Sequence, residues 1–373
     1  MRYVIYCPIG LNTGGPEALH QLCDAIRGFG YEAVLLPMWV QGEPSREYLI
    51  YDAPIICPEQ LTSKDIVITP EIQTSIPADV YNIVEGKVII WWLSVDNCPF
   101  EFSKNLEERT YPIDKDIWRA TNTKKLKKQI YVSKVRSVIG KNVRSIDSTL
   151  GLNIPRYRPV IETTDSVNLD FTKMTAITQS TYAFNFLNKF NGIQKMMVTD
   201  YINTNFAGST NMISKNSGKK NKKIISYNLA KGGYLVDNIK EHLPNINFVP
   251  IKGMNRNQVK ELLTQSDLYL DMGYFPGRDR LPREAILSGT PVFLAYRGAA
   301  RHKSDFPLEN EYLIDLQVEN PISVSVRINE LLKDSSNTFG LQASFLDFAL
   351  NNKNMFMGEV KSFLSNKFFQ SVK

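Results

Sequence analysis

The chain has 373 residues, of which 43% are hydrophobic and 22% are charged. This length fits two domains of ordinary size, and the composition is normal for a globular protein. The longest apolar stretch, 88–95, has the length of a buried strand, so no transmembrane helix is predicted. The first residues lack the pattern of a signal peptide, and we therefore expect a cytoplasmic protein.

The cysteine and histidine content argues against a metal centre. There are three histidines, and no CxxC pair occurs among the four cysteines, Cys7, Cys23, Cys57 and Cys98. Neither a zinc site nor a disulfide framework is expected. The formal net charge of +6 suits anionic partners such as sugar nucleotides or lipid headgroups. We expect no metal, no cofactor and no nucleic-acid partner.

The first 40 residues alternate between strand and helix patterns. An apolar strand pattern at 2–9 leads through a glycine loop into helical spacing over 17–30, followed by a strand pattern at 31–38. Such a βαβ unit predicts a parallel sheet. Further strands are expected at 65–71, 87–95, 129–134 and 174–180. Ligands bind beyond the carboxyl ends of such strands, where the chain places Gly14, Gly15, Glu71, Asp96, Asn97 and Ser180.

A polar, lysine-rich segment at 203–222 separates this part of the chain from a second βαβ series. We interpret it as a solvated linker, in preference to a nucleic-acid-binding segment. Strands are then predicted to begin near 223, 246, 267 and 290, with helices over 234–244, 255–266 and 281–289. The sequence thus predicts an N-terminal Rossmann-like domain (1–202), a linker (203–222), a second such domain (223–340) and C-terminal helices (341–373).

The C-terminal helices carry an apolar stripe from Phe345 to Leu364. We expect them to pack back on the N-terminal domain. The alternative is that the basic, aromatic end, 360–373, contacts an anionic membrane surface.

Two glycine loops are candidate phosphate sites. Gly14 and Gly15 precede the first helix, where backbone amides and the helix dipole favour an anion. The dinucleotide fingerprint is absent, and a tight turn that requires a positive φ is the alternative explanation. In the second domain, the sequence NLAKGG places Lys231 at a corresponding loop, either to neutralise a phosphate or as a surface lysine.

The segment 274–293 concentrates charge where a loop enters a helix. Arg278 and Arg280 offer paired donors for phosphate oxygens, and Glu284 can accept two hydrogen bonds from a ribose. A salt-bridge cluster that orders the loop, together with Asp279 and Arg283, is the alternative.

Candidate acceptor residues lie in the first domain. Asp96 and Asn97 follow an apolar strand, where they form either an Asx turn or an acceptor site with a general base. His20 lies one helical turn after Glu17. We place Glu17, Asp96 and Asn97 at the acceptor and assign catalytic roles to Asp96, His20 and Lys231, although a helix-face histidine is more often packed or solvated.

These motifs together resemble the GT-B glycosyltransferases, most closely the retaining branch that uses nucleotide sugars. "GRDRLPREAILSGTPV" matches the late signature of the family from Leu281 onward, and Glu284 takes the position of the ribose-binding glutamate. Pro276 replaces the first glutamate of that signature. Lys231 matches the phosphate-binding lysine, whereas Ser226 stands at the arginine position. "WWLSVDN" adds a likeness to capsule and O-antigen assembly proteins.

The resemblance implies two doubly wound parallel-sheet domains that face each other across a cleft. The expected function is transfer of a sugar from a nucleotide-sugar donor to a glycan or lipid-linked acceptor in bacterial surface polysaccharide synthesis. Gly14, Gly15, Lys231, Arg278, Arg280 and Glu284 would bind the donor. A sugar-nucleotide epimerase and a non-catalytic nucleotide-sugar-binding module are the alternatives, and the missing fingerprint weakens a Rossmann oxidoreductase.

Overall fold

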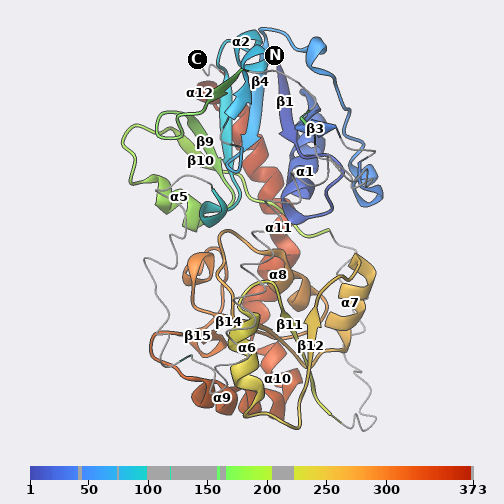
Figure 1. The fold of residues 1–373 in the computed structure, drawn as a ribbon, viewed down its shortest axis with the longest axis vertical. Coiled ribbons are helices and arrows are strands. Elements are labelled where there is room, and N and C mark those ends of the chain that lie inside the picture. Colours follow the sequence, from blue (N-terminus) through green and yellow to red (C-terminus); the bar gives the residue numbers. More distant parts are fainter. Residues whose placement is uncertain are drawn as a thin grey trace, which may run out of the picture.

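Two parallel β-sheets organise the chain, one in each of two domains that are stacked along the long axis of the molecule (Figure 1). The computed structural model describes residues 1–40, 44–73, 75–98, 118, 158–159, 165–203 and 222–370. The strand expected at 129–134 and nearly all of the linker expected at 203–222 lie outside these residues.

The N-terminal sheet has the order β10-β9-β6-β4-β1-β2, and all of its pairings are parallel. Its strands are β1 (Arg2–Cys7), β2 (Glu32–Pro37), β4 (Asp65–Pro70), β6 (Val88–Trp92), β9 (Thr175–Thr178) and β10 (Lys195–Met197). β4 and β6 are buried at every residue, as expected when helices cover both faces of a sheet. Every strand predicted among the described residues is present, and β10 was not predicted.

The C-terminal sheet has the order β12-β11-β13-β14-β15 and is also parallel. Its strands are β11 (Ile224–Asn228), β12 (Asn247–Ile251), β13 (Leu268–Asp271), β14 (Val292–Ala295) and β15 (Leu313–Ile314). β12 contains Pro250, which lacks an amide donor and is tolerated because β12 lies at the edge of the sheet. β15 is too short to give a periodic signal and was not predicted.

The order in which strands are added reverses at equivalent points in the two sheets. The chain starts at β1 or β11, adds one strand on one side, and then continues on the other side with β4 or β13. In doubly wound folds, ligands bind beyond the carboxyl ends of the strands at this switch point. The loops after β1, β4, β11 and β13 are therefore the places where a site is expected.

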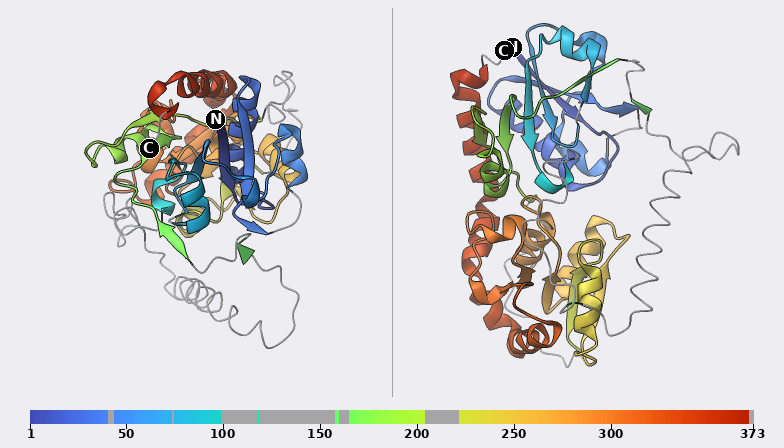
Figure 2. Two further views of the ribbon diagram at one scale, coloured as in Figure 1. Left: turned by 90° about the horizontal axis from the view of Figure 1, so that it is seen from above. Right: turned by 60° about the vertical axis from the view of Figure 1, so that its left-hand side comes forward.

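Helices cover the two sheets (Figure 2). In the N-terminal domain they are α1 (Gly14–Gly28), α2 (Ala78–Ile83) and α5 (Thr181–Leu187). The later helices are α6 (Gly233–Lys240), α7 (Arg256–Gln265), α8 (Arg280–Leu287), α9 (Pro321–Lys333), α10 (Ser335–Gly340), α11 (Ala343–Ser365) and α12 (Lys367–Gln370). Two small antiparallel pairs, β3 (Trp39–Val40) with β7 (Arg158–Pro159) and β5 (Ser75–Pro77) with β8 (Ser166–Asn168), lie beside the N-terminal sheet.

The long helix α11 joins the two domains (Figure 1). Its first half packs Phe345 against Phe306 of the C-terminal domain, with ring centroids 5.8 Å apart. Its second half places Phe356 and Phe363 in the core formed by β1 and α1 of the N-terminal domain. Helix α11 therefore holds one domain to the other. Within the part of the chain that the structure describes, no helix is both long and apolar enough to cross a membrane.

The two domains also meet directly at the carboxyl ends of their sheets. The backbone N–H of Val95 donates to the carbonyl oxygen of Pro276 at 2.9 Å. Gly277 is packed so closely that a Cβ atom there would collide with the carbonyl oxygen of Leu93. This close approach encloses the space between the domains.

Candidate functional site

A cavity of about 460 Å³ lies between the domains, at both switch points. Its N-terminal wall comes from the loops after β1, β4 and β6, and includes Gly14, Gly15 and Glu71. Its C-terminal wall comes from the loops after β11 and β13, and includes Lys231 and Arg278. The topology of two separate sheets thus brings residues more than 200 positions apart to one site.

Arg278 is the most unusual residue of this cavity. Its side chain is only 2% exposed, yet Nε and Nη2 donate no hydrogen bond to any of the described residues. Its backbone N–H donates to Gln179 Oε1 at 2.9 Å, and its guanidinium lies 4.6 Å from the centre of the Phe348 ring. Burial, followed by the charge of Arg283, lowers the pKa of Arg278 to about 10, so it remains cationic at neutral pH. Buried donors normally have partners, and these two have none among the described residues. Arg278 lines the cavity, whereas Phe348 of α11, on which its guanidinium stacks, does not.

Lys231 adds a second cation to the same wall. It follows β11 at the start of α6, where Gly232 adopts a positive φ of 73° and a Cβ would collide with the backbone of Met272. The ammonium group lies 2.5 Å from a carboxylate oxygen of Asp279. Burial opposes the charge of Lys231, but Asp279 outweighs it and the pKa of Lys231 is raised. Asp279 thus holds a charged lysine at the cavity.

Arg280 is held between two carboxylates. Its Nη2 lies 3.0 Å from Glu17 of the other domain, and its Nε lies 3.3 Å from Glu284 on the same helix. Burial opposes its charge, but Glu17 and Glu284 raise the pKa of Arg280. Arg280 lines the cavity, whereas Glu284, which is 7% exposed, does not. The structure therefore brings Arg280 to the site and places Glu284 behind it.

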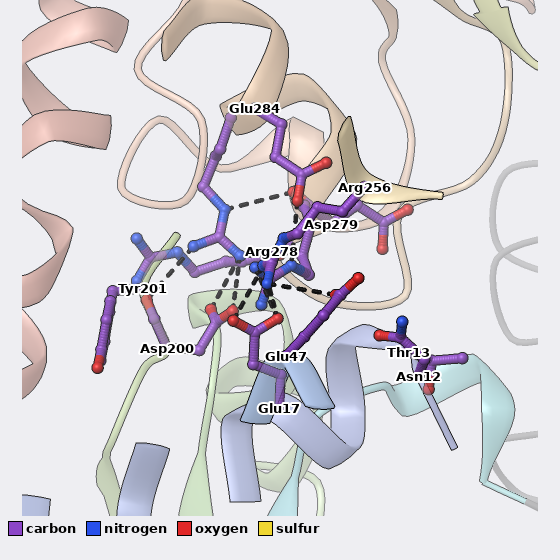
Figure 3. A network of polar contacts seen from close by, with 12 residues as sticks. Asn12, Thr13, Glu17, Glu47, Asp200, Tyr201, Arg256, Arg278, Asp279 and Glu284 are labelled. Carbon is purple, nitrogen blue, oxygen red and sulfur yellow. Dashed lines mark hydrogen bonds and ion pairs between the residues drawn. The ribbon is translucent and has the colours of Figure 1, made fainter. Parts of the chain in front are cut away.

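Glu17 is the centre of an ion-pair network between the domains. Arg256 Nη2 donates to both of its carboxylate oxygens, at 2.9 and 2.8 Å, and the Tyr51 hydroxyl donates to Oε1 at 2.8 Å. Arg256 also lies 3.7 Å from Glu47 (Figure 3). Glu17, which we expected at the acceptor, is 3% exposed and does not line the cavity. In this structure its bonds connect α1 to α7 and α8.

A second buried ion pair lies at the cavity, where Asp200 forms part of the wall. Arg283 Nη2 contacts both carboxylate oxygens of Asp200 at 2.9 Å, and both side chains are almost completely buried. Arg283 Nη1 also donates to Asn352 Oδ1 of α11 at 3.0 Å. Burial would raise the pKa of Asp200, but the charge of Arg283 outweighs it and the pKa is lowered. This pair fixes α8 and α11 against the N-terminal domain.

Gly14 and Gly15 lie at the cavity, at the N-terminus of α1. Neither has a positive φ, so the tight-turn alternative does not account for them. A Cβ on Gly14 would lie 2.6 Å from Arg280 Cδ. The absence of a side chain at Gly14 therefore allows the loop to approach Arg280 closely.

The remaining predicted residues differ in whether they line the cavity. Asn97 is exposed and lines the cavity, whereas Asp96, in the same short 3₁₀ turn (Val95–Asn97), does not. His20 is 2% exposed, its Nδ1 bonds the Pro16 carbonyl oxygen at 2.8 Å, and it does not line the cavity. Burial lowers the pKa of His20, which disfavours its charged form.

Three residues that line the cavity or hold the domains together beside it were not among the predicted site residues. Arg256 follows the Asn255 cap of α7 and has no local signal beyond its charge. Asp200 lies after the short strand β10, which was not predicted. Glu71 was noted as the residue after a strand, but nothing in the sequence distinguished it from the ends of the other strands. We found no group of three or more histidine, cysteine, aspartate or glutamate side chains suited to a metal ion within the described ranges.

Comparison with solved structures shows which fold this is. HepE from Anabaena in complex with UDP aligns over 98% of this chain and 100% of that chain, with a TM-score of 0.56 and 12% identity. HepE in complex with UDP-glucose aligns over the same shares, with a TM-score of 0.55 and 12% identity. Sucrose-phosphate synthase from Thermosynechococcus elongatus aligns over 98% and 99%, with a TM-score of 0.51 and 10% identity.

At these identities the likeness shows the fold alone. It confirms the expected GT-B architecture, with two Rossmann-like domains facing across a cleft and a helical C-terminal tail. No protein-family model matches the sequence, and no curated protein matches it significantly.

Proposed function

We propose that this protein is a glycosyltransferase that takes its sugar from a nucleoside diphosphate sugar. The observation that carries the proposal is the interdomain cavity at both switch points, where Lys231 and Arg278 of one domain meet Gly14 and Gly15 at the N-terminus of α1 in the other. A diphosphate would offer anionic acceptors to these cations and amides. The shared fold with HepE, which was solved with UDP and with UDP-glucose, supports this ligand class.

Charge accounts for how such a site would accelerate the reaction. As the bond from the sugar to the diphosphate breaks, negative charge grows on the leaving phosphate. Arg278 and Lys231 would stabilise that charge in the cleft between the domains. The amides of Gly14 and Gly15 at the start of α1 would face the same group from the other domain. We propose that these groups act without a metal ion.

The sugar acceptor would enter from the N-terminal domain, next to Asn97. This arrangement holds donor and acceptor together and reduces the entropic part of the barrier. We further propose that the enzyme retains the anomeric configuration, and that Glu284 supports ribose binding from behind Arg280, with which it pairs at 3.3 Å. We also propose that the acceptor is a glycan or lipid-linked sugar in bacterial surface polysaccharide synthesis. The likeness of Leu281–Val292 to the family signature supports the first two assignments, and the stretch WWLSVDN supports the third.

Nucleotide binding and transfer test the proposal in two steps. Thermal stability is measured with UDP-, GDP-, dTDP- and CMP-sugars, and transfer is then measured with the sugar that stabilises the protein most. Lys231→Ala and Glu284→Ala should each reduce transfer at least about tenfold, which is about 1.4 kcal/mol of barrier. Lys223→Ala is the matched control, because Lys223 pairs with Asp267 at the opposite end of β11. If no nucleotide sugar stabilises the protein, the proposal is wrong.

A further inference from the structure

The carboxylates that line the cavity are not equivalent. Asp200 is bound by Arg283, and Asp279 is bound by Lys231. Glu71 also lines the cavity, but none of the ion pairs among the described residues involves it, and no charged neighbour shifts its pKa. Among the described residues that line the cavity, Glu71 is therefore the carboxyl group without an ion-pair partner.

The fold fixes the position of Glu71 firmly. Its backbone N–H donates to the Trp91 carbonyl oxygen at 3.2 Å, extending the pairing of β4 with β6 by one residue. Its Oε2 accepts a hydrogen bond from the Leu93 N–H at 2.8 Å, and the residue is 1% exposed. Glu71 thus lies at the switch point of the N-terminal sheet, in the wall that faces Lys231 and Arg278.

The surroundings of Glu71 favour its neutral form. Burial outweighs the backbone hydrogen bonds and raises the pKa of Glu71 to about 8, so the carboxyl group is mostly protonated at pH 7. A protonated carboxyl group both donates and accepts hydrogen bonds, as a sugar hydroxyl does. The adjacent cavity wall is apolar, with Ile72 and Leu93. The charged residues that line the cavity with Glu71 are Asp200, Lys231, Arg278, Asp279 and Arg280.

We propose that Glu71 anchors the acceptor by exchanging hydrogen bonds with a hydroxyl group of an uncharged sugar. This inference rests on the proposed function, and it names the acceptor class at Glu71 as neutral. An acceptor with a carboxylate or phosphate at that point would meet a carboxyl group and an apolar wall, and would bind poorly. Glu71 would then select among acceptors, while the cations of the opposite wall select the donor.

A purely structural role is the competing explanation, because Glu71 also bonds the Leu93 amide. The substitution Glu71→Gln separates the two, since glutamine keeps an oxygen for that amide and mimics a neutral carboxyl group. Glu71→Ala removes both hydrogen-bonding groups. Asp65→Asn is the matched control, because Asp65 is equally buried on the same strand but pairs with Arg2 at the opposite end.

Direct binding provides the test, with two p-nitrophenyl sugars as probes. The β-D-glucoside is neutral, and the β-D-glucuronide differs from it by a carboxylate. Binding of each is followed by saturation-transfer NMR in the presence of UDP, and UDP binding is measured separately by calorimetry. We expect the wild-type protein to bind the glucoside, and to bind it more weakly from pH 7 to pH 9 as Glu71 loses its proton.

Glu71→Ala should weaken glucoside binding about tenfold, the effect of a lost buried hydrogen bond, and leave UDP affinity unchanged. Glu71→Gln should bind the glucoside with an affinity within about threefold of that of the wild type, and this affinity should not depend on pH. Asp65→Asn should bind the glucoside as the wild type does. The inference is overturned if Glu71→Ala binds the glucoside normally, if Glu71→Gln loses as much affinity as Glu71→Ala, or if the glucuronide binds better. If the wild type binds none of the four nucleotide sugars, the proposed function is contradicted instead, while glucoside binding would still report on Glu71.

Discussion

Replacement of Arg278 by methionine should stabilise the empty protein and weaken its binding of nucleotide. Methionine resembles arginine in length and can keep the packing contact with Phe348, but it carries neither charge nor donors. The substitution therefore removes the buried donors Nε and Nη2, which have no partner among the described residues. Stability and binding should change in opposite directions.

The magnitude follows from the contacts. Each unsatisfied buried donor of this charged group costs about 1.5 kcal/mol, so two cost about 3 kcal/mol. The cation–π contact with Phe348, 4.6 Å from the ring centre, offsets about 2 kcal/mol of this because the pair is buried. Arg278→Met should therefore raise the free energy of unfolding of the unliganded protein by about 1 kcal/mol, or about 2 °C in Tm. Loss of charge-assisted bonds to a diphosphate should cost about 2 kcal/mol, which is about 30-fold in UDP affinity.

Thermal unfolding with and without UDP measures both effects. UDP at 100 times its Kd should stabilise the wild-type protein by about 2.7 kcal/mol, and the same concentration should stabilise the variant far less. The two proteins should therefore exchange their order of stability when UDP is added.

Arg283→Met, in the helix α8 that follows Arg278, is the matched control. It leaves the buried Asp200 without its partner and should destabilise the protein by about 3–5 kcal/mol. If Arg278→Met destabilises the empty protein and keeps its UDP response, then Arg278 is a structural residue and the anion site is misplaced.

Two further substitutions test how the domains are held together. Glu17→Gln weakens the contacts with Arg256 and Arg280. It should lower the free energy of unfolding by about 3 kcal/mol and increase the radius of gyration measured by small-angle X-ray scattering. An unchanged radius of gyration would show that α11 alone holds the two domains together. Gly277→Ala places a Cβ against the carbonyl oxygen of Leu93 and should lower Tm. Gly358→Ala in α11 places a Cβ where no neighbouring side chain or other segment lies within 4 Å, and should raise Tm slightly. Equal changes in Tm would contradict the close contact between the domains at Gly277.

The fold could be predicted because its signals are local. The apolar strands β4 and β6 are buried throughout, and the capping box of Asn255 with Gln258 marks the start of α7. Alternation of such strands and helices leads to parallel sheets. The short strands β10 and β15 were missed because two or three residues carry no periodicity.

Part of the candidate site could be predicted, namely the residues that come directly after a predicted strand. Gly14 begins α1 directly after the loop that follows β1, and Lys231 and Arg278 lie in the loops after β11 and β13; all three line the cavity. His20 and Glu284 lie on helices, where the sequence gives the face of the helix but not what that face meets. The structure places His20 beside Tyr48 and Glu284 beside Arg280.

The sequence by itself determined the two βαβ series and the loops at the carboxyl ends of their strands, because propensity and periodicity act over a few residues. Only the tertiary structure decided which charges are paired. Glu17 and Arg280 are 263 positions apart and 3.0 Å apart in space, so one neutralises the other. By contrast, two donors of Arg278 have no hydrogen-bond partner, and Glu71 has no ion-pair partner, among the described residues. Electrostatic energy depends on distance and burial, and neither quantity can be read from the order of residues along the chain.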